Sequence, residues 1–445
     1  MYRLSQIIVE VLARIYLWRF KPQIIGITGN VGKTSTKEAI GVVVSRIKKV
    51  RIGGGNLNNE IGLPFNIISD SADEYYEKGG SLIFGIKSFF KAIFGLLSSD
   101  YPEILVLEYG ADKPGDIKKL ARKYKPHVSV VTAVGEVPVH VEFFSGPEEL
   151  AREKRKLVEV LDSTDFAVLN FDDLVVLEMK DKTKAKVLTC GFGEGAMVKA
   201  SNLNVRTDEH GFPVGLGLKI QQGESFVPVR IDGSLGKSQG YAAAAAAAVG
   251  LIFGMNLVQI SEALSEYQGP KGRLKILKGI KNSVIIDDTY NASPASTHLA
   301  IETLKEIKKV SSDASPTLAV GVPVGARRAV AILGDMLELG RYTIEAHEQA
   351  GNFLKNDFDI LITVGSRAKF IAQSAANQML VENIHKFETS DEAKLKVKRL
   401  IKEGDLVLVK GSQGMRMEKI VEEIMAEPQK KNELLVRQSR KWLTK

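Results

Sequence analysis

The sequence has almost no cysteine, since Cys190 is the only one among 445 residues. A single cysteine excludes an intramolecular disulfide and is typical of a protein kept in a reducing compartment. A large excess of one charge is also missing, because 61 Lys and Arg stand against 53 Asp and Glu, for a net charge of +8. The basic residues are spread along the chain. We therefore interpret them as solvated surface and expect no nucleic-acid partner.

The sequence also lacks an uninterrupted hydrophobic run long enough to span a bilayer, and we find no cleavable signal. Residues 7–20 are apolar and aromatic, but Glu10, Arg14 and Arg19 interrupt them. They predict an amphipathic helix, either packed on the domain that follows or lying on a membrane surface. Residues 81–97 allow the same two interpretations. We expect a cytoplasmic protein, held at the inner face of the membrane if these helices are surface anchors.

The most informative segment that is present is GITGNVGKTST, residues 26–36, between a short apolar run and a helical stretch. Strand, glycine loop and helix in this order are typical of a nucleoside triphosphate site. Backbone N–H groups and the helix N-terminus bind phosphate, Lys33 reaches the outer phosphates, and Thr34 can ligate Mg2+. The strict pattern requires a glycine where this chain has Ile27, so the loop is a variant. An ordinary strand-to-helix turn is the alternative.

Two further segments place polar side chains next to apolar ones. Residues 53–64, GGGNLNNEIGLP, form a turn in which Asn56, Asn58 and Asn59 either cap the backbone or face a polar ligand. Residues 103–107 predict a buried strand that ends at Glu108. Ligands bind at the carboxyl ends of strands in open parallel sheets, so Glu108 is placed as a Mg2+ ligand unless it is simply solvated.

The remaining pattern predicts an α/β protein. It has a P-loop-type central ATPase domain with a small antiparallel β appendage at residues 197–231, followed by a Rossmann-like doubly wound C-terminal domain. Residues 311–326 resemble a mobile loop, and the chain beyond Pro428 a frayed or disordered helix. We expect an N-terminal helix, a central domain, a C-terminal domain and a basic tail, with the boundaries 1–22, 23–268, 269–426 and 427–445.

Taken together, these segments resemble the Mur ligases, the ATP-dependent amide-bond ligases of peptidoglycan precursor synthesis. The family's variant loop, T-G-x-x-G-K-[ST], corresponds to residues 28–34, which accounts for the departure at Ile27. The resemblance covers roughly residues 22–426. Five further motifs follow in the family's order: residues 56–64 (NLNNEIGLP), 107–111 (LEYGA), 287–294 (DDTYNASP), 333–340 (LGDMLELG) and 409–412 (VKGS).

The resemblance implies ATP, two Mg2+ ions and a carbamylated lysine. It also implies that Lys154, which its charged neighbours alone would place in solvent, is that lysine and a metal ligand. The implied catalytic residues are Lys33, His140, Lys154 and Arg273, and the implied metal ligands are Thr34, Glu108, His140 and Lys154. The implied ATP-binding residues are Thr28, Gly29, Asn30, Val31, Gly32, Lys33, Thr34, Ser35, Arg273 and Asp288. The implied substrate-binding residues are Asn56, Asn58, Asn59, Asn291, Lys410 and Ser412.

The activity implied by the resemblance is phosphorylation of a substrate carboxylate by ATP, followed by attack of an amine on the acyl phosphate. The expected substrates are a UDP-MurNAc-peptide and D-Ala-D-Ala. Two alternatives remain. One is a Mur-type ligase for a different cell-wall or polymer peptide. The other is an ATP-binding scaffold without turnover, against which the retained site residues argue.

Two departures from the family pattern qualify this prediction. Only about 25 residues precede the glycine loop, where the family has a UDP-binding domain. We therefore expect a protein partner or a membrane surface to help bind the UDP-sugar, as the UDP-binding domain does in the family. Ser238 and Ala242 stand where the family usually has His and Asn before the alanine-rich helix, which puts adenine recognition by that segment in question.

Overall fold

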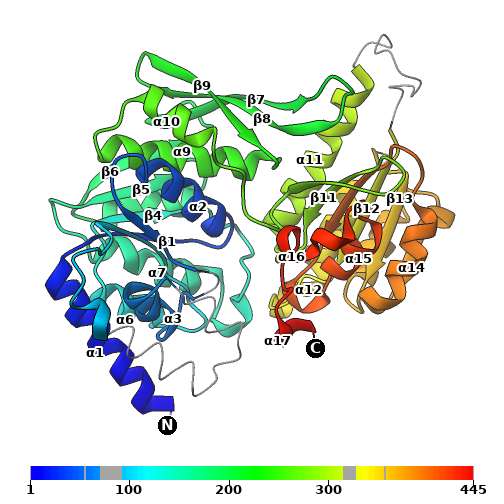
Figure 1. Cartoon of the computed structure of the whole chain (residues 1–445). Helices are drawn as coiled ribbons and strands as arrows, with labels where there is room; N and C mark the ends of the chain where they lie inside the picture. The colour runs from blue at the N-terminus through cyan, green and yellow to red at the C-terminus, as the bar shows by residue number, and fades with distance from the viewer. Residues whose placement is uncertain (1, 55–56, 71–92, 314–326, 355–356, 444–445) are drawn as a thin grey trace.

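The computed structural model describes residues 2–54, 57–70, 93–313, 327–354 and 357–443. These residues form two α/β lobes that lie side by side (Figure 1). We call the lobe built on the nine-stranded sheet β1–β9 the first lobe, and the lobe built on the six-stranded sheet β10–β15 the second lobe. The predicted α/β class, with a mostly parallel sheet in each half, is confirmed.

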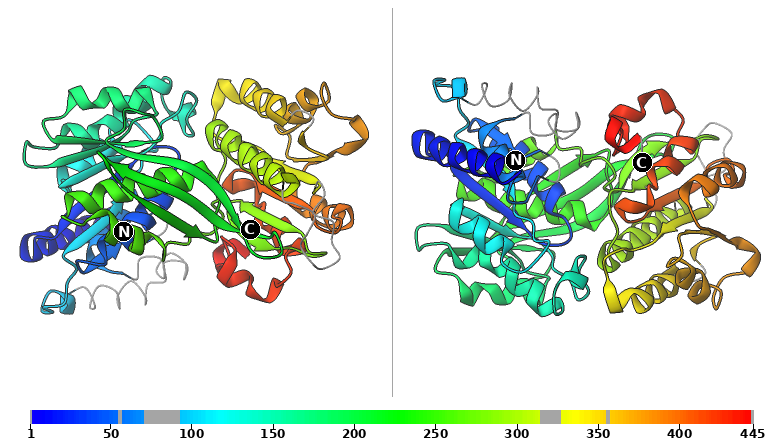
Figure 2. Two further views of the ribbon diagram at one scale, coloured as in Figure 1. Left: turned by 90° about the horizontal axis from the view of Figure 1, so that it is seen from above. Right: turned by 90° about the horizontal axis from the view of Figure 1, so that it is seen from below.

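The sheet of the first lobe has the order β2-β3-β1-β4-β5-β6-β7-β8-β9. The strands from β2 to β7 are parallel, and β7, β8 and β9 are antiparallel. The predicted antiparallel segment is thus a continuation of the main sheet, and it reaches the second lobe (Figure 2). The strands are β1 Gln23–Thr28, β2 Val50–Ile52, β3 Ile104–Glu108, β4 Val128–Val131, β5 Phe166–Asn170, β6 Lys186–Gly191, β7 Val198–Thr207, β8 Pro213–Gln222 and β9 Ser225–Asp232.

Helices cover both faces of this sheet. On one face α2 and α9 pack together, because the fully buried alanines of α9 let the two helices approach closely. On the other face α1, α3, α6 and α7 enclose a second apolar cluster. The helices are α1 Tyr2–Phe20, α2 Lys33–Val44, α3 Gly62–Ile68, α6 Asp116–Lys123, α7 Pro147–Glu159, α8 Leu174–Leu177, α9 Lys237–Ile252 and α10 Leu257–Leu264, with the 3-10 turns η1 Val141–Phe143 and η2 Glu178–Lys182.

The N-terminal helix is confirmed as α1, and it is apolar on two opposite faces. Ala13 and Tyr16 are buried against the first lobe, and Phe20 stacks on Tyr101 with ring centroids 4.4 Å apart. The opposite face leaves Trp18 78% exposed. Among the described residues, no helix is long and apolar enough to cross a membrane. Most of the second apolar segment, residues 81–97, lies outside the described residues.

The sheet of the second lobe has the order β10-β11-β15-β12-β13-β14. Only β10 is antiparallel to its neighbour, as expected for a doubly wound sheet with one antiparallel edge strand. The strands are β10 Lys275–Lys278, β11 Val284–Asp288, β12 Ala329–Gly334, β13 Ile360–Val364, β14 Ile384–Phe387 and β15 Leu406–Lys410. The helices are α11 Pro294–Asp313, α12 Thr343–Leu354, α13 Lys369–Ala375, α14 Ser390–Leu400, α15 Glu418–Ile424, α16 Lys431–Leu434 and α17 Arg440–Leu443, with the 3-10 turns η3 Gly340–Tyr342, η5 Val381–Asn383, η6 Gln413–Met415 and η7 Pro428–Lys430.

Two predicted irregular segments differ from the structure. The predicted loop at 311–326 starts too early, because residues 311–313 belong to α11, and 314–326 lie outside the described residues. The interpretation of the tail as frayed or disordered was wrong. Leu435 is buried in the core of the second lobe, and Arg437 donates hydrogen bonds to the carbonyls of Thr289 and Tyr290. Buried apolar area and satisfied carbonyls outweigh the basic composition that suggested disorder.

Candidate active site

A cleft of about 300 Å3 lies between the two lobes, where the carboxyl ends of strands from both sheets face each other. Such strand ends are where open parallel sheets bind ligands. Both walls are rich in polar groups. From the first lobe the lining includes Asn30, Val31, Lys33, Thr34, Asn58, Asn59, Glu108, Asp112 and His140, and from the second lobe Arg273, Tyr290, Asn291, Ser293, Glu338, Ser412 and Gln413.

The glycine loop is tighter than the sequence suggested, because β1 continues through Thr28 and α2 starts at Lys33. Gly29 has φ +138°, and a Cβ there would meet the Thr132 hydroxyl at 2.0 Å, so this position needs glycine. The N–H groups of Asn30 and Val31 both donate to the carbonyl of Ala133. The N–H groups at the start of α2 are therefore the ones suited to bind phosphate.

Lys33 is half-buried at the start of α2, and its Nζ donates to the carbonyl of Gly29 at 2.9 Å. Burial lowers the pKa of this amine, and the carboxylates of Glu108 and Asp112 oppose that shift, while Arg273 of the second lobe adds to it. A bound polyphosphate would oppose the shift in the same way as the two carboxylates. The environment of Lys33 thus matches a role in holding negative charge.

Glu108 ends β3 and is only 5% exposed, and its Oε1 has no hydrogen-bond partner within the part of the chain that the structure describes. The ammonium of Lys37 lies 3.6 Å from this oxygen and donates to the carbonyl of Gly53 at 2.5 Å. A buried carboxylate oxygen without a hydrogen bond costs folding free energy unless a cation binds to it. The residues present therefore fit a metal ion at Glu108, with Lys37 holding the carboxylate in place.

A complete metal site is not formed by acidic, histidine and cysteine side chains alone. Over the described ranges no group of three or more such side chains could hold a metal ion. Mg2+ ordinarily keeps several waters and takes phosphate oxygens beside one or two carboxylates, so this finding is compatible with Mg2+ bound as part of a nucleotide complex. Thr34 and His140 line the same cleft as Glu108.

Lys154 points into the protein, although it lies in the charged run Arg152 to Lys156 of α7. It is 2% exposed, whereas Arg155 pairs with Glu159 on the outer face of the helix. Burial, and next the positive charge of Lys33, hold the pKa of Lys154 well below its usual value. The inward orientation that the family resemblance implied is confirmed. Its neutral amine is favoured at this position.

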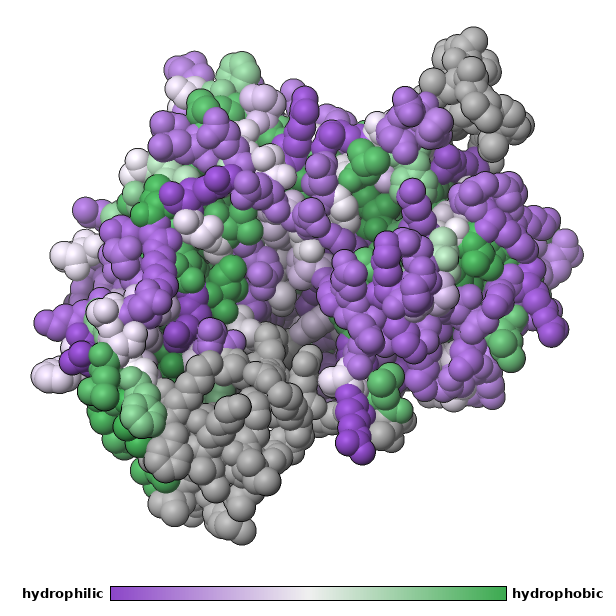
Figure 3. Space-filling model, in the orientation of Figure 1, coloured by the Kyte–Doolittle hydropathy of each residue, from purple (hydrophilic) through white to green (hydrophobic). Residues whose placement is uncertain are grey.

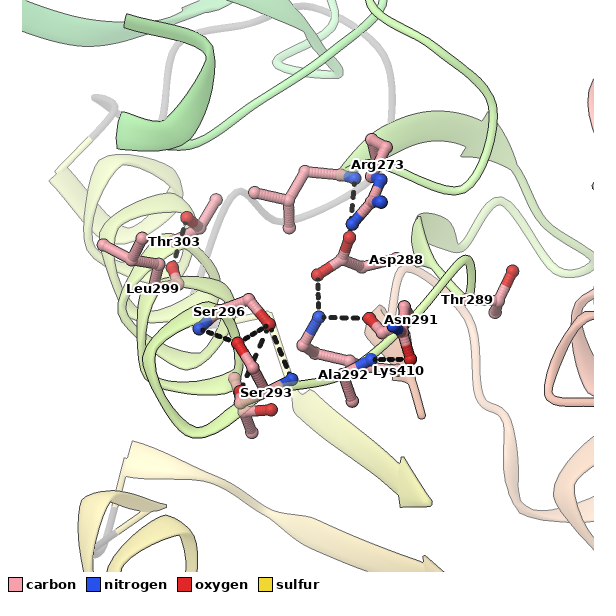
Figure 4. A network of polar contacts seen from close by, with 12 residues as sticks. Arg273, Asp288, Thr289, Asn291, Ala292, Ser293, Ser296, Leu299, Thr303 and Lys410 are labelled. Atoms are coloured by element: carbon pink, nitrogen blue, oxygen red, sulfur yellow. Dashed lines mark hydrogen bonds and ion pairs between the residues drawn. The ribbon is translucent and has the colours of Figure 1, made fainter. Parts of the chain in front are cut away.

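The second lobe contributes a connected polar network (Figure 4). Asp288, at the end of β11, accepts a hydrogen bond from the N–H of Leu274 and forms an ion pair of 2.6 Å with Lys410. Lys410 also donates to the carbonyl of Asn291. Arg273 lies over the ring of Tyr290, 4.1 Å from its centroid. The network fixes the loop after β11, and Arg273 is left facing the cleft.

The structure places the predicted site residues in three groups. Most line the cleft. Thr28, Lys154, Asp288 and Lys410 are buried behind its walls, and Lys410 is already engaged by Asp288. Asn56 lies outside the described residues. Ser238 lines a small pocket of about 50 Å3 beside the glycine loop. Ser35 and Asp288 line a second pocket, which adjoins the first at Ser238.

Sequence reasoning missed Lys37, Asp112, Tyr290 and Glu338. Lys37 follows Lys33 by four residues and so lies on the same face of α2, which could have drawn attention to it. Glu338 and Tyr290 lie within recognised motifs, but only the folded chain brings them opposite His140 and Arg273.

Comparison with known proteins agrees with this geometry. Residues 90–250 match the Mur ligase middle domain and residues 272–413 the Mur ligase, glutamate ligase domain. The UDP-N-acetylmuramoyl-tripeptide--D-alanyl-D-alanine ligase of Bacillus subtilis is 28% identical over 418 residues, which cover 94% of this chain and 79% of the relative. The enzyme of the same name from Rickettsia prowazekii is 27% identical and covers 93% and 81%.

Solved structures give the same result for the fold. The MurF ligase of Thermotoga maritima in complex with ADP superposes with a TM-score of 0.73 at 25% identity, covering 95% of this chain and 84% of that chain. A MurF crystal structure from Acinetobacter baumannii gives 0.72 at 23% identity. The two domain matches together span more than half of the chain, so the chain belongs to the Mur ligase family.

Proposed function

We propose that the chain is an ATP-dependent ligase that joins D-alanyl-D-alanine to the peptide carboxylate of a UDP-N-acetylmuramoyl-tripeptide. The observation that carries this proposal is the cleft between the lobes. It combines a phosphate-binding loop and a buried carboxylate with one oxygen free of hydrogen bonds among the described residues on one wall with Arg273 on the other. The named relatives are ligases of this kind and span most of the chain.

In this proposal the protein's own residues hold the reacting groups and compensate their charge. Lys33 and the N–H groups at the start of α2 hold the phosphates from the first lobe, and Arg273 approaches them from the second. Mg2+ would bind at Thr34, Glu108 and His140 and supply neutralisation of phosphate charge. Asn58, Asn59, Asn291 and Ser412 offer hydrogen bonds to the substrates. Closing the lobes would exclude water from an acyl phosphate.

We further propose that Lys154 is carbamylated and serves the second Mg2+. Its amine is buried and its pKa is lowered, and a neutral amine is the form that reacts with CO2. The new N–C bond converts the neutral amine into a carbamate and releases one proton, so that an anion lies near Lys33. The carbamate and the Lys33 ammonium attract each other.

The nucleoside is proposed to lie next to the glycine loop, in the small pocket that includes Thr132, Asn170, Ser238 and Tyr241. This pocket is lined mainly by apolar atoms. Ser238, which also lines it, stands at the position where the family usually has a histidine. Replacing ATP by GTP in the ligation assay tests how strictly the base is selected.

The activity is tested by ADP release from the full chain with UDP-MurNAc-tripeptide and D-Ala-D-Ala, with each substrate omitted in turn. We expect ADP release that requires both substrates. Equal release without D-Ala-D-Ala, or release only with a different peptide, would contradict the proposed substrates. Formation of the pentapeptide product, followed by mass spectrometry, separates ligation from uncoupled ATP hydrolysis.

We also propose that α1 attaches the protein peripherally to an anionic membrane. Ile8, Val11, Ile15 and Trp18 recur at helical spacing on its outward face and are all exposed, and Figure 3 shows hydrophobic residues gathered where Figure 1 places α1. The exposed side chains of Arg14 and Arg19 flank this stripe on its two sides, and Arg14 also pairs with Glu10 at 2.9 Å. An apolar stripe between basic residues is typical of helices lying in a membrane interface.

Sedimentation with vesicles of phosphatidylcholine, with and without phosphatidylglycerol, tests this attachment. We expect binding that needs the anionic lipid and that Trp18→Ser with Ile15→Ser removes. Val258→Ser, which changes another exposed apolar residue, on α10, is the matched control. A lack of vesicle binding combined with self-association or capture of a protein partner through α1 would overturn the membrane assignment.

A further inference from the structure

A histidine–carboxylate contact across the cleft joins the two lobes at the proposed metal site. Nδ1 of His140, in the first lobe, lies 2.6 Å from a carboxylate oxygen of Glu338, in the second lobe. Next to this pair, Gly340 packs so closely on Glu142 that a Cβ at position 340 would lie 3.1 Å from the Cβ of Glu142. The turns η1 and η3 thus meet face to face.

The backbone on both sides of this contact adopts a conformation that non-glycine residues rarely take. His140 has φ 69° and Glu338 has φ 62°. Left-handed backbone at non-glycine residues costs free energy and persists where the surroundings enforce it. The fold thus holds both residues of the pair in left-handed backbone conformations that position their side chains toward each other.

The loop that carries Glu338 is held rigidly by the rest of the second lobe. Asp335 accepts hydrogen bonds from the N–H groups of Arg367 and Ala368. The N–H of Met336 donates to Nε2 of the buried His347 at 3.0 Å. The N–H of Leu337 donates to the hydroxyl of Ser412 at 2.8 Å. Glu338 is therefore presented to the first lobe by a fixed support.

We propose that Glu338 is a positioning residue for the metal site: its carboxylate holds the Nδ1–H of His140, so that Nε2 is the acceptor offered to a divalent cation. This inference rests on the proposed function, in which His140 is a metal ligand. A carboxylate that accepts the second N–H of a metal-binding histidine fixes its tautomer and ring orientation. Here the supporting carboxylate comes from the opposite lobe.

The arrangement couples metal binding to closure of the cleft. With the lobes apart, His140 would lose its support and the cation would lose an oriented ligand. By thermodynamic reciprocity, a cation bound at His140 must then favour the closed arrangement by the same factor. The second lobe would thus act on the metal site as well as on the nucleotide.

The test is a titration of the full chain with Mn2+ alone, with free Mn2+ measured by electron paramagnetic resonance. Glu338→Gln keeps the size of the side chain and removes its charge. We expect this variant to bind Mn2+ about 10- to 100-fold more weakly than the unmodified chain. Glu142→Gln, the same change two residues from His140 on an exposed side chain, is the matched control and should leave Mn2+ affinity unchanged.

A double-variant cycle separates positioning from a general loss of structure. His140→Ala should weaken Mn2+ binding, and adding Glu338→Gln to it should cause little further loss, because Glu338 acts through His140. Mn2+ should also shorten the distance between spin labels placed on the two lobes, and Glu338→Gln should abolish that change. Unaltered melting temperatures would show that the variants are folded.

The outcomes distinguish this inference from the proposed function. If Glu338→Gln binds Mn2+ like the unmodified chain, if its effect adds fully to that of His140→Ala, or if the unmodified chain binds no Mn2+, the positioning role is refuted even where ligation is observed. If the chain ligates no D-Ala-D-Ala but the Mn2+ cycle behaves as expected, the positioning role stands and the substrate assignment fails.

Discussion

Replacement of Lys154 gives the sharpest test of the site, because composition and family resemblance make opposite predictions for it. A solvated lysine in a charged helix should be dispensable. A buried one that becomes a metal-binding carbamate should not. Lys154→Met keeps most of the volume of the side chain and removes the amine, whereas Lys154→Ala removes both. Arg155→Ala changes the adjacent, outward-facing residue and serves as the control.

The Lys154 variants should differ in how much they lower kcat and how much they lower the unfolding free energy. Loss of one charged group that stabilises the transferred phosphoryl group typically costs about 10²- to 10³-fold in kcat. Lys154→Ala also leaves a cavity, which we expect to cost about 2 kcal/mol of unfolding free energy. Lys154→Met leaves little cavity and buries no amine. Since burial lowers the pKa of Lys154 in the folded chain, the unfolded chain binds more protons and the amine makes stability rise with pH. We expect Lys154→Met to flatten that rise.

The assay is coupled ADP release at saturating substrates, beside thermal melting. Lys154→Met should melt no lower than the unmodified chain and still lose at least about 100-fold in kcat. Carbon dioxide removal should slow the unmodified chain, and acetate or formate should partly restore Lys154→Ala by occupying the vacated anionic position. A fully active Lys154→Met variant would refute the metal-site interpretation of α7.

Three further predictions concern Lys33 and Arg273 of the cleft and Asp287, which is buried in β11. Lys33→Ala should abolish ATP turnover without lowering the melting temperature, whereas the exposed control Lys48→Ala should keep activity; normal turnover by Lys33→Ala would refute the phosphate-loop assignment. Arg273→Lys should lower kcat about 10-fold or more, because an ammonium reproduces neither the guanidinium fork nor its stacking, and unchanged kinetics would contradict a phosphate contact. Burial raises the pKa of Asp287 to about 6, so this group makes the folded state lose stability as pH rises from about 4 to 6. Asp287→Asn should therefore gain about 3 kcal/mol at pH 7 and almost nothing at pH 4 in urea unfolding, and an equal effect at both pH values would exclude the mechanism.

The sequence was sufficient where local pattern decides the structure. An apolar run closed by a polar loop correctly predicted the strand that ends at Glu108, and the glycine loop was placed correctly between β1 and α2. The family spacing alone identified Lys154 as inward-facing. Local charge could not identify it, because Lys154 and Arg155 are adjacent basic residues in the same charged run. Only the folded helix turns Lys154 inward and Arg155 toward Glu159.

The contacts that could not be predicted are those between distant segments. The pairing of His140 with Glu338 joins positions about 200 residues apart, and no periodicity or composition indicates it. The tail was mispredicted for the same reason. Its Arg437 donates hydrogen bonds to the carbonyls of Thr289 and Tyr290, which lie 147 or more residues earlier in the sequence. Such contacts follow from the tertiary arrangement of the lobes.

The order of the strands has a consequence for how the protein is made. In the first lobe β1 is an interior strand that precedes the other strands of its sheet in the sequence, so later strands can add to either side of it. In the second lobe β15 lies between β11 and β12 but is the last strand of its sheet in the sequence. Until residues 406–410 leave the ribosome, both neighbours keep unpaired edges, and pairing across so many residues is slow. The second lobe is thus the part of the nascent chain most dependent on protection from aggregation during synthesis.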